Sequence, residues 1–231
     1  GWQPMRSACG RFHLVFNGEV FNHVELREEL TALGHRFTTR TDTEVLLAAW
    51  QQWGEAALGR LVGMFAFAIL DSSARRMLLA RDPFGIKPLY FMSRQGRTVF
   101  ASEIGPLLAL PWARRTADPQ SVFDYLRFGV PRPPAATFFL GLRAVPPAHV
   151  PEFALDSPAA APEARRYWSP EVRTESDLSF DEAAARLRDL LIDSVRLHLR
   201  SDVRVGPALS GGIVSSSILM LPRGGGGGTA T

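Results

Sequence analysis

Apolar residues in the first hundred positions follow, in several short segments, the two-residue period of β-strands. Phe12, Leu14 and Phe16 alternate with polar or smaller residues and predict a strand. The run 64–70, MFAFAIL, is apolar almost throughout, which predicts a strand buried on both faces. Further strands are predicted at 77–80, 89–92 and 98–101. Short strands at such regular intervals favour sheets that are largely antiparallel.

Helices are predicted where a capping residue precedes helical spacing of apolar side chains. The segment 24–33 has that spacing and stops at Gly34, a frequent residue at helix C-termini. Thr-Asp-Thr-Glu at 41–44 matches a capping box and opens a second helix. Asp118 followed by proline predicts a helix over 119–128. Strands and helices in this arrangement predict a layered α+β domain.

The last quarter of the chain follows a different plan. A second capping box at 179–182 predicts a helix that reaches about His198. A strand is predicted over 203–209, followed by Ser-Gly-Gly at 210–212 and a helix from about Ser215. A glycine turn that leads from a strand into a helix aims backbone N–H groups and the positive end of the helix dipole at an anion. The pattern predicts the first elements of an α/β domain, with an ordinary strand-to-helix turn as the alternative.

Proline and alanine enrichment separates these two parts. Prolines cluster at 131–134, and 156–164 is rich in alanine and proline, as connecting segments often are. We therefore expect a first domain at 1–135, a connecting segment at 136–178, the start of a second domain at 179–223 and a disordered glycine-rich tail at 224–231.

Composition narrows the function classes. The net charge is +3, but basic residues are dispersed among acidic ones, so no nucleic-acid partner is expected. No apolar run approaches the ~20 residues of a membrane span and the first ten residues lack signal-peptide features, so we expect no membrane association and a cytoplasmic location. One cysteine excludes an internal disulfide, and five histidines without ligand spacing predict no metal site.

Five ordered segments resemble one enzyme family. They are FNGEVFNH (16–23), TDTEVLL (41–47), GMFAFAILD (63–71), RDPFGIKPLYF (81–91) and FASEIGPLL (100–108). Together they are similar to the class II glutaminase domain of glutamine-hydrolysing asparagine synthetases. ALSGGIVSSS at 208–217 resembles the pyrophosphate loop, usually SGGxDSS, of the ATP pyrophosphatase domain that follows it in that family. The resemblance implies an α+β fold of the N-terminal-nucleophile glutaminase type, followed by the first elements of an α/β PP-loop domain.

For the glutaminase part, the resemblance implies hydrolysis of the glutamine amide by an N-terminal cysteine whose α-amine serves as base. The side chain of Asn17 and the N–H of Gly18 would donate to the oxyanion, held on the tight turn that Asn-Gly favours. Glu19 and Asp42 would bind the backbone groups of glutamine, with the Asp42 carboxylate on its ammonium. Read without the resemblance, Asn17-Gly18 is a plain hairpin turn and Asp42 favours its helix N-terminus.

Other residues are expected to be structural or absent from the chemistry. Arg81, Asp82 and Lys87 are predicted to form a salt-bridged turn. Cys9 has no free α-amine and is predicted to be a bystander. In the family, the nucleophilic cysteine and the arginine that holds the glutamine carboxylate precede the segment matching Gly1, so we expect this chain to begin inside the domain and to be inactive by itself.

For the synthetase part, the resemblance implies a set of residues around the ATP phosphates, with Mg²⁺ as the accompanying ion. The set is Leu209, Ser210, Gly211, Gly212, Ser215 and Ser216. Val214 stands where the loop's usual aspartate acts near Mg²⁺ and pyrophosphate, and valine can neither carry charge nor meet a hydrated metal. Pro207 lies inside the predicted strand, where its missing N–H interrupts a ladder. These departures favour either a sequence error or lost activity.

As a whole, the resemblance implies asparagine biosynthesis. Glutamine, aspartate and ATP would be the substrates: ammonia released from glutamine would amidate an ATP-activated aspartate, in a cytoplasmic enzyme for which the family suggests a homodimer. Two alternatives stay open at this point. One is another amide-forming amidotransferase with the same architecture but a different carboxylate substrate, and the other is a non-catalytic glutaminase-like module that binds a partner or an amino acid.

Overall fold

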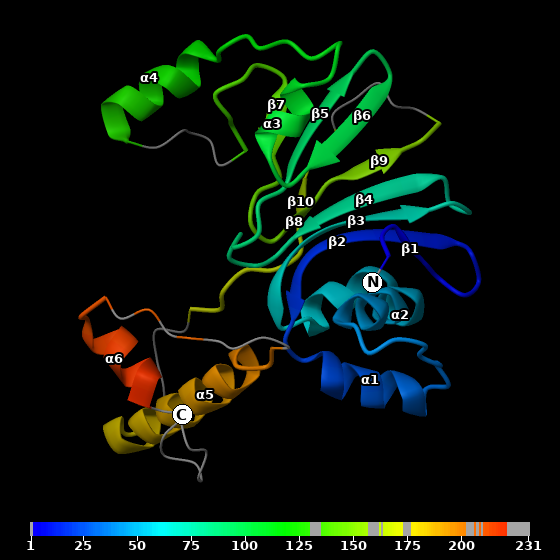
Figure 1. Cartoon of the computed structure of the whole chain (residues 1–231). Helices are drawn as coiled ribbons and strands as arrows, with labels where there is room; N and C mark the ends of the chain where they lie inside the picture. Colours follow the sequence, from blue (N-terminus) through cyan, green and yellow to red (C-terminus); the bar gives the residue numbers. More distant parts are fainter. Residues whose placement is uncertain are drawn as a thin grey trace. The chain divides into compact units, whose positions relative to one another are not determined.

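The computed structural model separates the chain into two units, residues 1–170 and 171–231 (Figure 1). The structure describes residues 2–129, 135–156, 162, 164–172, 177–201, 206, 208 and 210–220. The strands of the first unit are β1 (Met5–Arg6), β2 (Phe12–Val20), β3 (Gly63–Asp71), β4 (Arg76–Arg81), β5 (Tyr90–Arg94), β6 (Arg97–Ala101), β7 (Leu142–Ala144), β8 (His149–Val150), β9 (Glu152–Ala154) and β10 (Arg165–Arg166). Its helices are α1 (His23–Ala32), α2 (Asp42–Trp53), the 3₁₀ helix η1 (Gly54–Arg60), α3 (Ile104–Leu108) and α4 (Pro119–Phe128).

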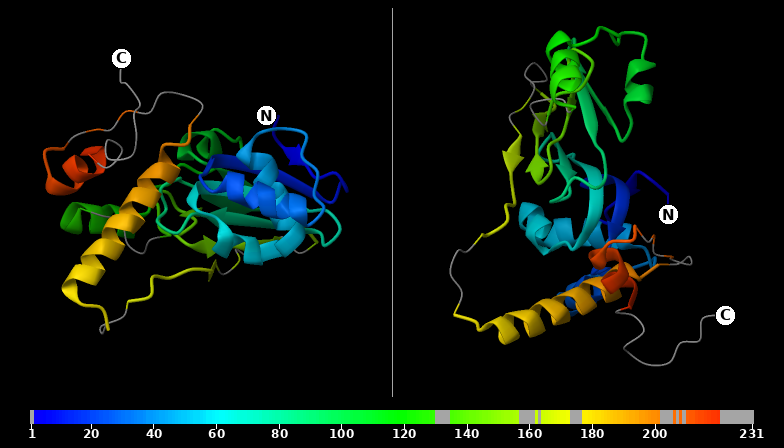
Figure 2. Two further views of the ribbon diagram at one scale, coloured as in Figure 1. Left: turned by 90° about the horizontal axis from the view of Figure 1, so that it is seen from below. Right: turned by 90° about the vertical axis from the view of Figure 1, so that its left-hand side faces the viewer.

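The strands of the first unit form antiparallel sheets. A five-stranded sheet has the order β1-β2-β3-β4-β9, a three-stranded sheet has the order β6-β5-β7, and β10 pairs with β8. Helices α1 and α2 lie along one face of the five-stranded sheet, and the three-stranded sheet lies toward its other face (Figures 1 and 2). The α+β class and the largely antiparallel sheets predicted from the sequence are confirmed.

Strand β3 is buried on both faces, as its apolar run predicts. Successive side chains of a strand point to opposite sides, so the two faces can be read from alternate residues. Phe65, Phe67 and Ile69 belong to the core under α1 and α2, where the Phe67 ring meets Trp50 edge-on with 5.8 Å between ring centroids. Ala66 and Ala68 belong to a second core beneath the three-stranded sheet. Large side chains therefore fill one layer, and small ones let the two sheets approach.

The structure corrects the predicted hairpin turn at Asn17-Gly18. Both residues lie inside β2, where Asn17 pairs with Ala66 and Gly18 pairs with Phe65 of β3. A Cβ atom added at Gly18 would lie 2.2 Å from the Met64 carbonyl oxygen and 2.7 Å from the Phe65 Cα. Pairing with β3 thus overrides the local preference of Asn-Gly for a turn, and glycine is needed because the backbones approach closely.

The turn 81–87 is structural, as predicted, but its charged groups bind the backbone. The Asp82 side chain is fully buried and accepts hydrogen bonds from the N–H groups of Phe65, Phe84, Ile86 and Lys87 at 2.9–3.2 Å. The Arg81 guanidinium donates to the carbonyl oxygens of Gly85, Lys87 and Val145, each at 2.8 Å. The predicted salt-bridged turn is therefore wrong in its chemistry, because the charges of Arg81 and Asp82 are satisfied by peptide groups instead of side-chain partners.

An ion pair joins the start of β2 to the end of β3. The Arg11 guanidinium donates to both carboxylate oxygens of Asp71, at 2.8 and 2.6 Å. The Asp71 side chain is only 2% exposed and also accepts the N–H groups of Ser73 and Ala74. These hydrogen bonds, led by that of Arg11, lower the pKa of Asp71 from its ordinary 3.8 to about 2. The charged form of this carboxyl group therefore stabilises the folded state.

We expect the folded state to lose this stabilisation in acid. Because the pKa of Asp71 is lower in the folded chain, its contribution of about 2 kcal/mol is present in full above about pH 4 and disappears as the pH falls through about 2. Urea unfolding of the wild type and Asp71→Asn should give a difference in unfolding free energy that narrows toward low pH. A difference independent of pH between 6 and 2 would contradict this account.

The second unit is described through two helices, α5 (Phe180–His198) and α6 (Ile213–Met220). At α5 the predicted capping box is complete: the Ser179 hydroxyl accepts the Glu182 N–H, and the Glu182 carboxylate accepts the Ser179 N–H. Most of the strand predicted at 203–209 falls outside the described residues. Within the described ranges, no helix is both long enough and apolar enough to cross a membrane.

Candidate functional site

Strand β2 presents the predicted oxyanion residues in its second half. Asn17 and Glu19 are exposed and Gly18 is half-buried, whereas Phe16 and Val20 on either side belong to the core. The alternating pattern fixes the polar side chains on one face because the apolar neighbours anchor the other. The site residues are therefore held by a central strand of the five-stranded sheet rather than by a turn.

Asn17 is oriented by a residue 85 positions away in the sequence. Its side-chain Nδ2 donates to the Ser102 hydroxyl oxygen at 3.0 Å, and Ser102 follows directly after β6. A side-chain amide carries two N–H donors, so one remains for another acceptor. The contact fixes the orientation of the Asn17 amide, and an oxyanion hole requires donors with a fixed orientation.

Asp42 reaches the same strand from the start of α2. Its Oδ2 accepts the N–H of Val20 at 2.9 Å. The preceding Thr41 caps the helix by accepting the Glu44 N–H, which places Asp42 in the first helical turn. The second half of the predicted capping box is absent at this helix, because the Glu44 carboxylate binds Thr38 and Thr39 instead. The fold thus brings a half-buried carboxylate to the end of the Asn17–Glu19 segment.

Cys9 lies at the other end of β2. It is exposed, sits in the turn between β1 and β2, and its sulfur is 3.3 Å from the Ser7 hydroxyl. Hydrogen bonds, first of all from Ser7, lower the pKa of its thiol. From Phe12 to Asn17 the strand alone spans roughly 16 Å, and Cys9 lies beyond Phe12. The thiol therefore does not face Asn17, and its role as a bystander stays a prediction.

The predicted phosphate loop closes on the start of α6. Gly211 has a positive φ of 81°, and the Ser215 and Ser216 hydroxyls both donate to the Gly212 carbonyl oxygen at 3.0 Å. The Ser210 and Ser215 hydroxyl oxygens are 3.0 Å apart. Val214 is 72% exposed, and Leu209 lies outside the described residues. Gly211 thus makes the turn into α6, and the hydroxyl protons of Ser215 and Ser216 are directed to the Gly212 carbonyl oxygen.

Sequence reasoning missed Ser102. The residue belongs to the segment FASEIGPLL, which contributed to the resemblance, but no spacing rule connects it with Asn17. The contact exists because β6 ends beside β2, and this depends on how the two sheets stack. Composition and periodicity do not contain that information.

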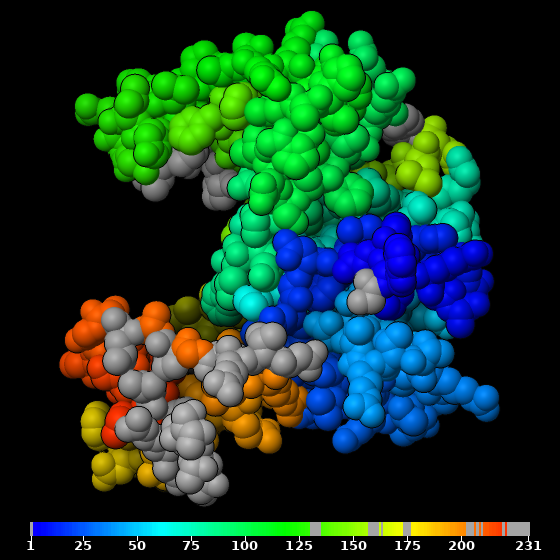
Figure 3. All heavy atoms as spheres, in the orientation of Figure 1, coloured from blue at the N-terminus to red at the C-terminus, as the bar shows by residue number. Residues whose placement is uncertain are grey.

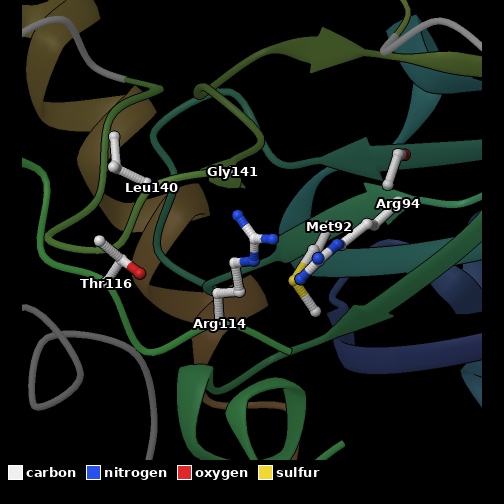
Figure 4. A pocket seen from close by; sticks show the side chains of 7 residues that line it. Met92, Arg94, Arg114, Thr116, Leu140 and Gly141 are labelled. Carbon is white, nitrogen blue, oxygen red and sulfur yellow. The ribbon is translucent and has the colours of Figure 1, made fainter. Parts of the chain in front are cut away.

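Two cavities in the first unit are lined by other residues. The larger one, about 650 Å³, lies between β1 and the α1–α2 connection, with Met5, Phe37 and Leu47 among its apolar walls. The smaller one, about 290 Å³, lies beside β5 and is shown in Figure 4. Among the residues that the structure describes, no group of three or more histidine, cysteine or acidic side chains could hold a metal ion.

Comparison with known proteins assigns the first unit to a class of domain. The family model described as "Glutamine amidotransferase domain" matches residues 1–168. The chain belongs to this family, which confirms the resemblance read from the five segments. A second family model, described as "Asparagine synthase", matches residues 186–224.

Curated relatives carry more specific names. The chain is 36% identical over 228 residues to "Asparagine synthetase [glutamine-hydrolyzing] 3" of Bacillus subtilis, covering 97% of this chain and 36% of that protein. It is 40% identical over 235 residues to "Putative asparagine synthetase [glutamine-hydrolyzing]" of Mycobacterium tuberculosis, covering 95% and 35%. "Amidase chyE" of Penicillium rubens is 32% identical over 225 residues, covering 94% and 32%. The chain therefore spans about a third of the length of these relatives.

A solved structure also matches. It is the glutamine phosphoribosylpyrophosphate amidotransferase of Bacillus subtilis in complex with ADP and GMP, with a TM-score of 0.49 and 21% sequence identity, covering 96% of this chain and 47% of that one.

Proposed function

We propose that residues 1–170 are the glutaminase part, and residues 171–231 the beginning of the synthetase part, of a glutamine-dependent asparagine synthetase. The observation that carries the proposal is the hydrogen bond from the Val20 N–H to Asp42, because it brings a carboxylate beside the strand that presents Asn17, Gly18 and Glu19. In this assignment Asp42 and Glu19 bind the substrate ammonium and backbone of glutamine.

The proposed reaction is thiol-mediated amide hydrolysis. The thiolate of an N-terminal cysteine, the nucleophile that the family resemblance implies, attacks the side-chain amide carbon of glutamine, and the carbonyl oxygen becomes an oxyanion that accepts hydrogen bonds from Asn17 Nδ2 and the Gly18 N–H. The amide nitrogen leaves as ammonia after taking up a proton, and water then hydrolyses the thioester to glutamate. Cys9, the single thiol of the 231 residues, is not the nucleophile in this proposal because it lies at the opposite end of β2.

The acceptor half of the proposal uses ATP and aspartate. The backbone N–H groups at Ser210–Gly212 and the start of α6 would receive the ATP phosphates, favoured by the positive end of the helix. Residues 210–220 contain no carboxylate, and Val214 stands in place of the expected aspartate, so a Mg²⁺ ion does not fit this segment.

A second candidate differs only in the acceptor. The relative named "Amidase chyE" covers nearly the whole chain at 32% identity, so the same architecture occurs under a name other than asparagine synthetase. An amide-forming amidotransferase with another carboxylate substrate would use Asn17, Gly18 and Asp42 in the same way. For either candidate we propose a cytoplasmic location and a homodimer.

The test measures the release of glutamate from glutamine by the protein that contains these 231 residues. We expect Asn17→Ala to lower kcat about 100- to 1,000-fold, because one oxyanion donor is lost. Asp42→Asn should mainly raise KM for glutamine, since it weakens the pairing with the substrate ammonium. The matched control Cys9→Ala should leave both constants unchanged.

Two results would contradict the proposal. One is turnover by Asn17→Ala at the wild-type rate. The other is glutamate release by the isolated 231-residue chain that survives Cys9→Ala, because the proposal places no other nucleophilic thiol in this chain. Formation of asparagine from aspartate, against other carboxylates, then distinguishes the two candidates.

A further inference from the structure

A small pocket lies beside β5, between that strand and two connecting segments. Its volume is about 290 Å³, and Figure 4 shows its walls. The lining residues are Met92, Ser93, Arg94, Arg114, Thr116, Leu140 and Gly141. None of the residues assigned to the proposed glutamine site, nor Ser102, contributes to this lining. The pocket is therefore a separate feature of the first unit.

The side chain of Arg94 is held in place by a backbone carbonyl. Met92 and Arg94 are two residues apart in β5 and so face the same side of the sheet. Met92 is 4% exposed and forms an apolar wall. The half-buried Arg94 donates from Nη1 to the Trp112 carbonyl oxygen at 2.8 Å, which uses one of the five N–H groups of its guanidinium. The side chain is thus oriented while most of its donors remain for a ligand.

Arg114 contributes a second guanidinium to the same space. Figure 4 shows the charged ends of Arg94 and Arg114 both pointing into the pocket from different segments. The lining contains no carboxylate, so two positive charges share a cavity without an acidic partner from its walls. Elsewhere in this unit, arginines such as Arg11 and Arg60 pair with a carboxylate. The unbalanced charge makes the pocket an attractive site for an anion.

The charge and size of the pocket select the kind of anion. We propose that it binds the phosphate group of a small phosphorylated metabolite. A phosphate monoester carries close to two negative charges at neutral pH and matches two guanidiniums, whereas a carboxylate carries one. The fork geometry of arginine suits phosphate oxygens, and the Thr116 hydroxyl is a further polar group on the lining. Met92 and Leu140 offer apolar contact to a short carbon skeleton, and the volume lies just below the ~300–1,000 Å³ of drug-sized sites.

Calorimetric titration of the full chain tests this assignment, with glycerol 3-phosphate as the probe and acetate at equal ionic strength as the comparison. We expect saturable binding of the phosphate ester and at least about tenfold weaker binding of acetate. Arg114→Gln should weaken binding of the phosphate ester by about tenfold or more, because a charge-assisted hydrogen bond is lost.

Arg115→Gln is the matched control. Arg115 is the neighbouring exposed arginine, donates to the Leu108 carbonyl oxygen and is not part of the lining, so its loss should leave the affinity unchanged. Thermal unfolding midpoints report whether each variant folds. If Arg114→Gln does not fold, Thr116→Val takes its place and is expected to weaken binding of the phosphate ester several-fold. The proposal is overturned if no saturable binding occurs, if acetate binds as tightly as the ester, or if Arg115→Gln weakens binding as much as Arg114→Gln.

Discussion

Gly18→Ala is expected to lower the free energy of unfolding by about 3 kcal/mol or more. The added methyl group would lie 2.2 Å from the Met64 carbonyl oxygen and 2.7 Å from the Phe65 Cα. Both obstacles belong to the backbone of β3, so no rotamer change can relieve the contact, and the two central strands must move apart. Chemical denaturation of the variant and the wild type measures the loss.

Gly59→Ala is the appropriate comparison. Gly59 lies in η1, and a Cβ atom there would have no heavy atom within 4 Å. We expect that substitution to change the unfolding free energy by less than about 1 kcal/mol. Equal losses at Gly18 and Gly59 would show that the close approach of β2 and β3 does not explain the glycine.

Asp82→Ala is expected to cost about 4 kcal/mol or more. Removal of the fully buried carboxylate would leave the N–H groups of Phe65, Phe84, Ile86 and Lys87 without their acceptor, and the bond to Phe65 is a buried one. The turn and its attachment to β3 should loosen together. Urea unfolding gives the free-energy change, and amide hydrogen exchange at these residues reports the local loss.

The control for this second substitution is an exposed aspartate. Asp156 pairs with Arg75 at the surface, with both side chains about 60% exposed, so Asp156→Ala should cost at most about 1 kcal/mol. A similar cost at Asp82 and Asp156 would mean that the buried hydrogen bonds of Asp82 contribute no more than a surface ion pair does.

Much of the fold follows from local sequence patterns. The apolar run 64–70 predicts a strand buried on both faces, and β3 is that strand. The helix predicted at 119–128 matches α4 residue for residue, since Asp118 accepts the Gln120 N–H and the left-handed Gly129 ends the helix. These features depend on side chains within a few positions of one another, so short windows of sequence contain them.

Other features depend on contacts that no short window contains. Asn-Gly favours a turn locally, but the paired strand β3 keeps Asn17 and Gly18 extended. The contact of Asn17 with Ser102 spans 85 residues, and Arg94 and Arg114 line the same pocket although they lie 20 positions apart, on β5 and on a connecting segment. The family resemblance pointed to Asn17, Gly18, Glu19 and Asp42 as site residues, but it did not predict how they are arranged in space. Only the folded chain brings Asp42 to the Val20 end of β2, whereas Cys9 lies at the opposite end of that strand.

The alternation of phenylalanine and alanine in β3 also determines how precisely β2 and β3 are aligned. If β3 slid by one position against β2, Phe65 and Phe67 would turn toward the second sheet, where only the methyl groups of Ala66 and Ala68 have room. Side-chain size therefore rules out the shifted pairing, independently of polarity. Asn17 is aligned opposite Ala66, so the size of the buried side chains of β3 determines the position of the Asn17 amide. Substitutions that repack this core should therefore shift the Asn17 N–H donor even when no site residue is changed.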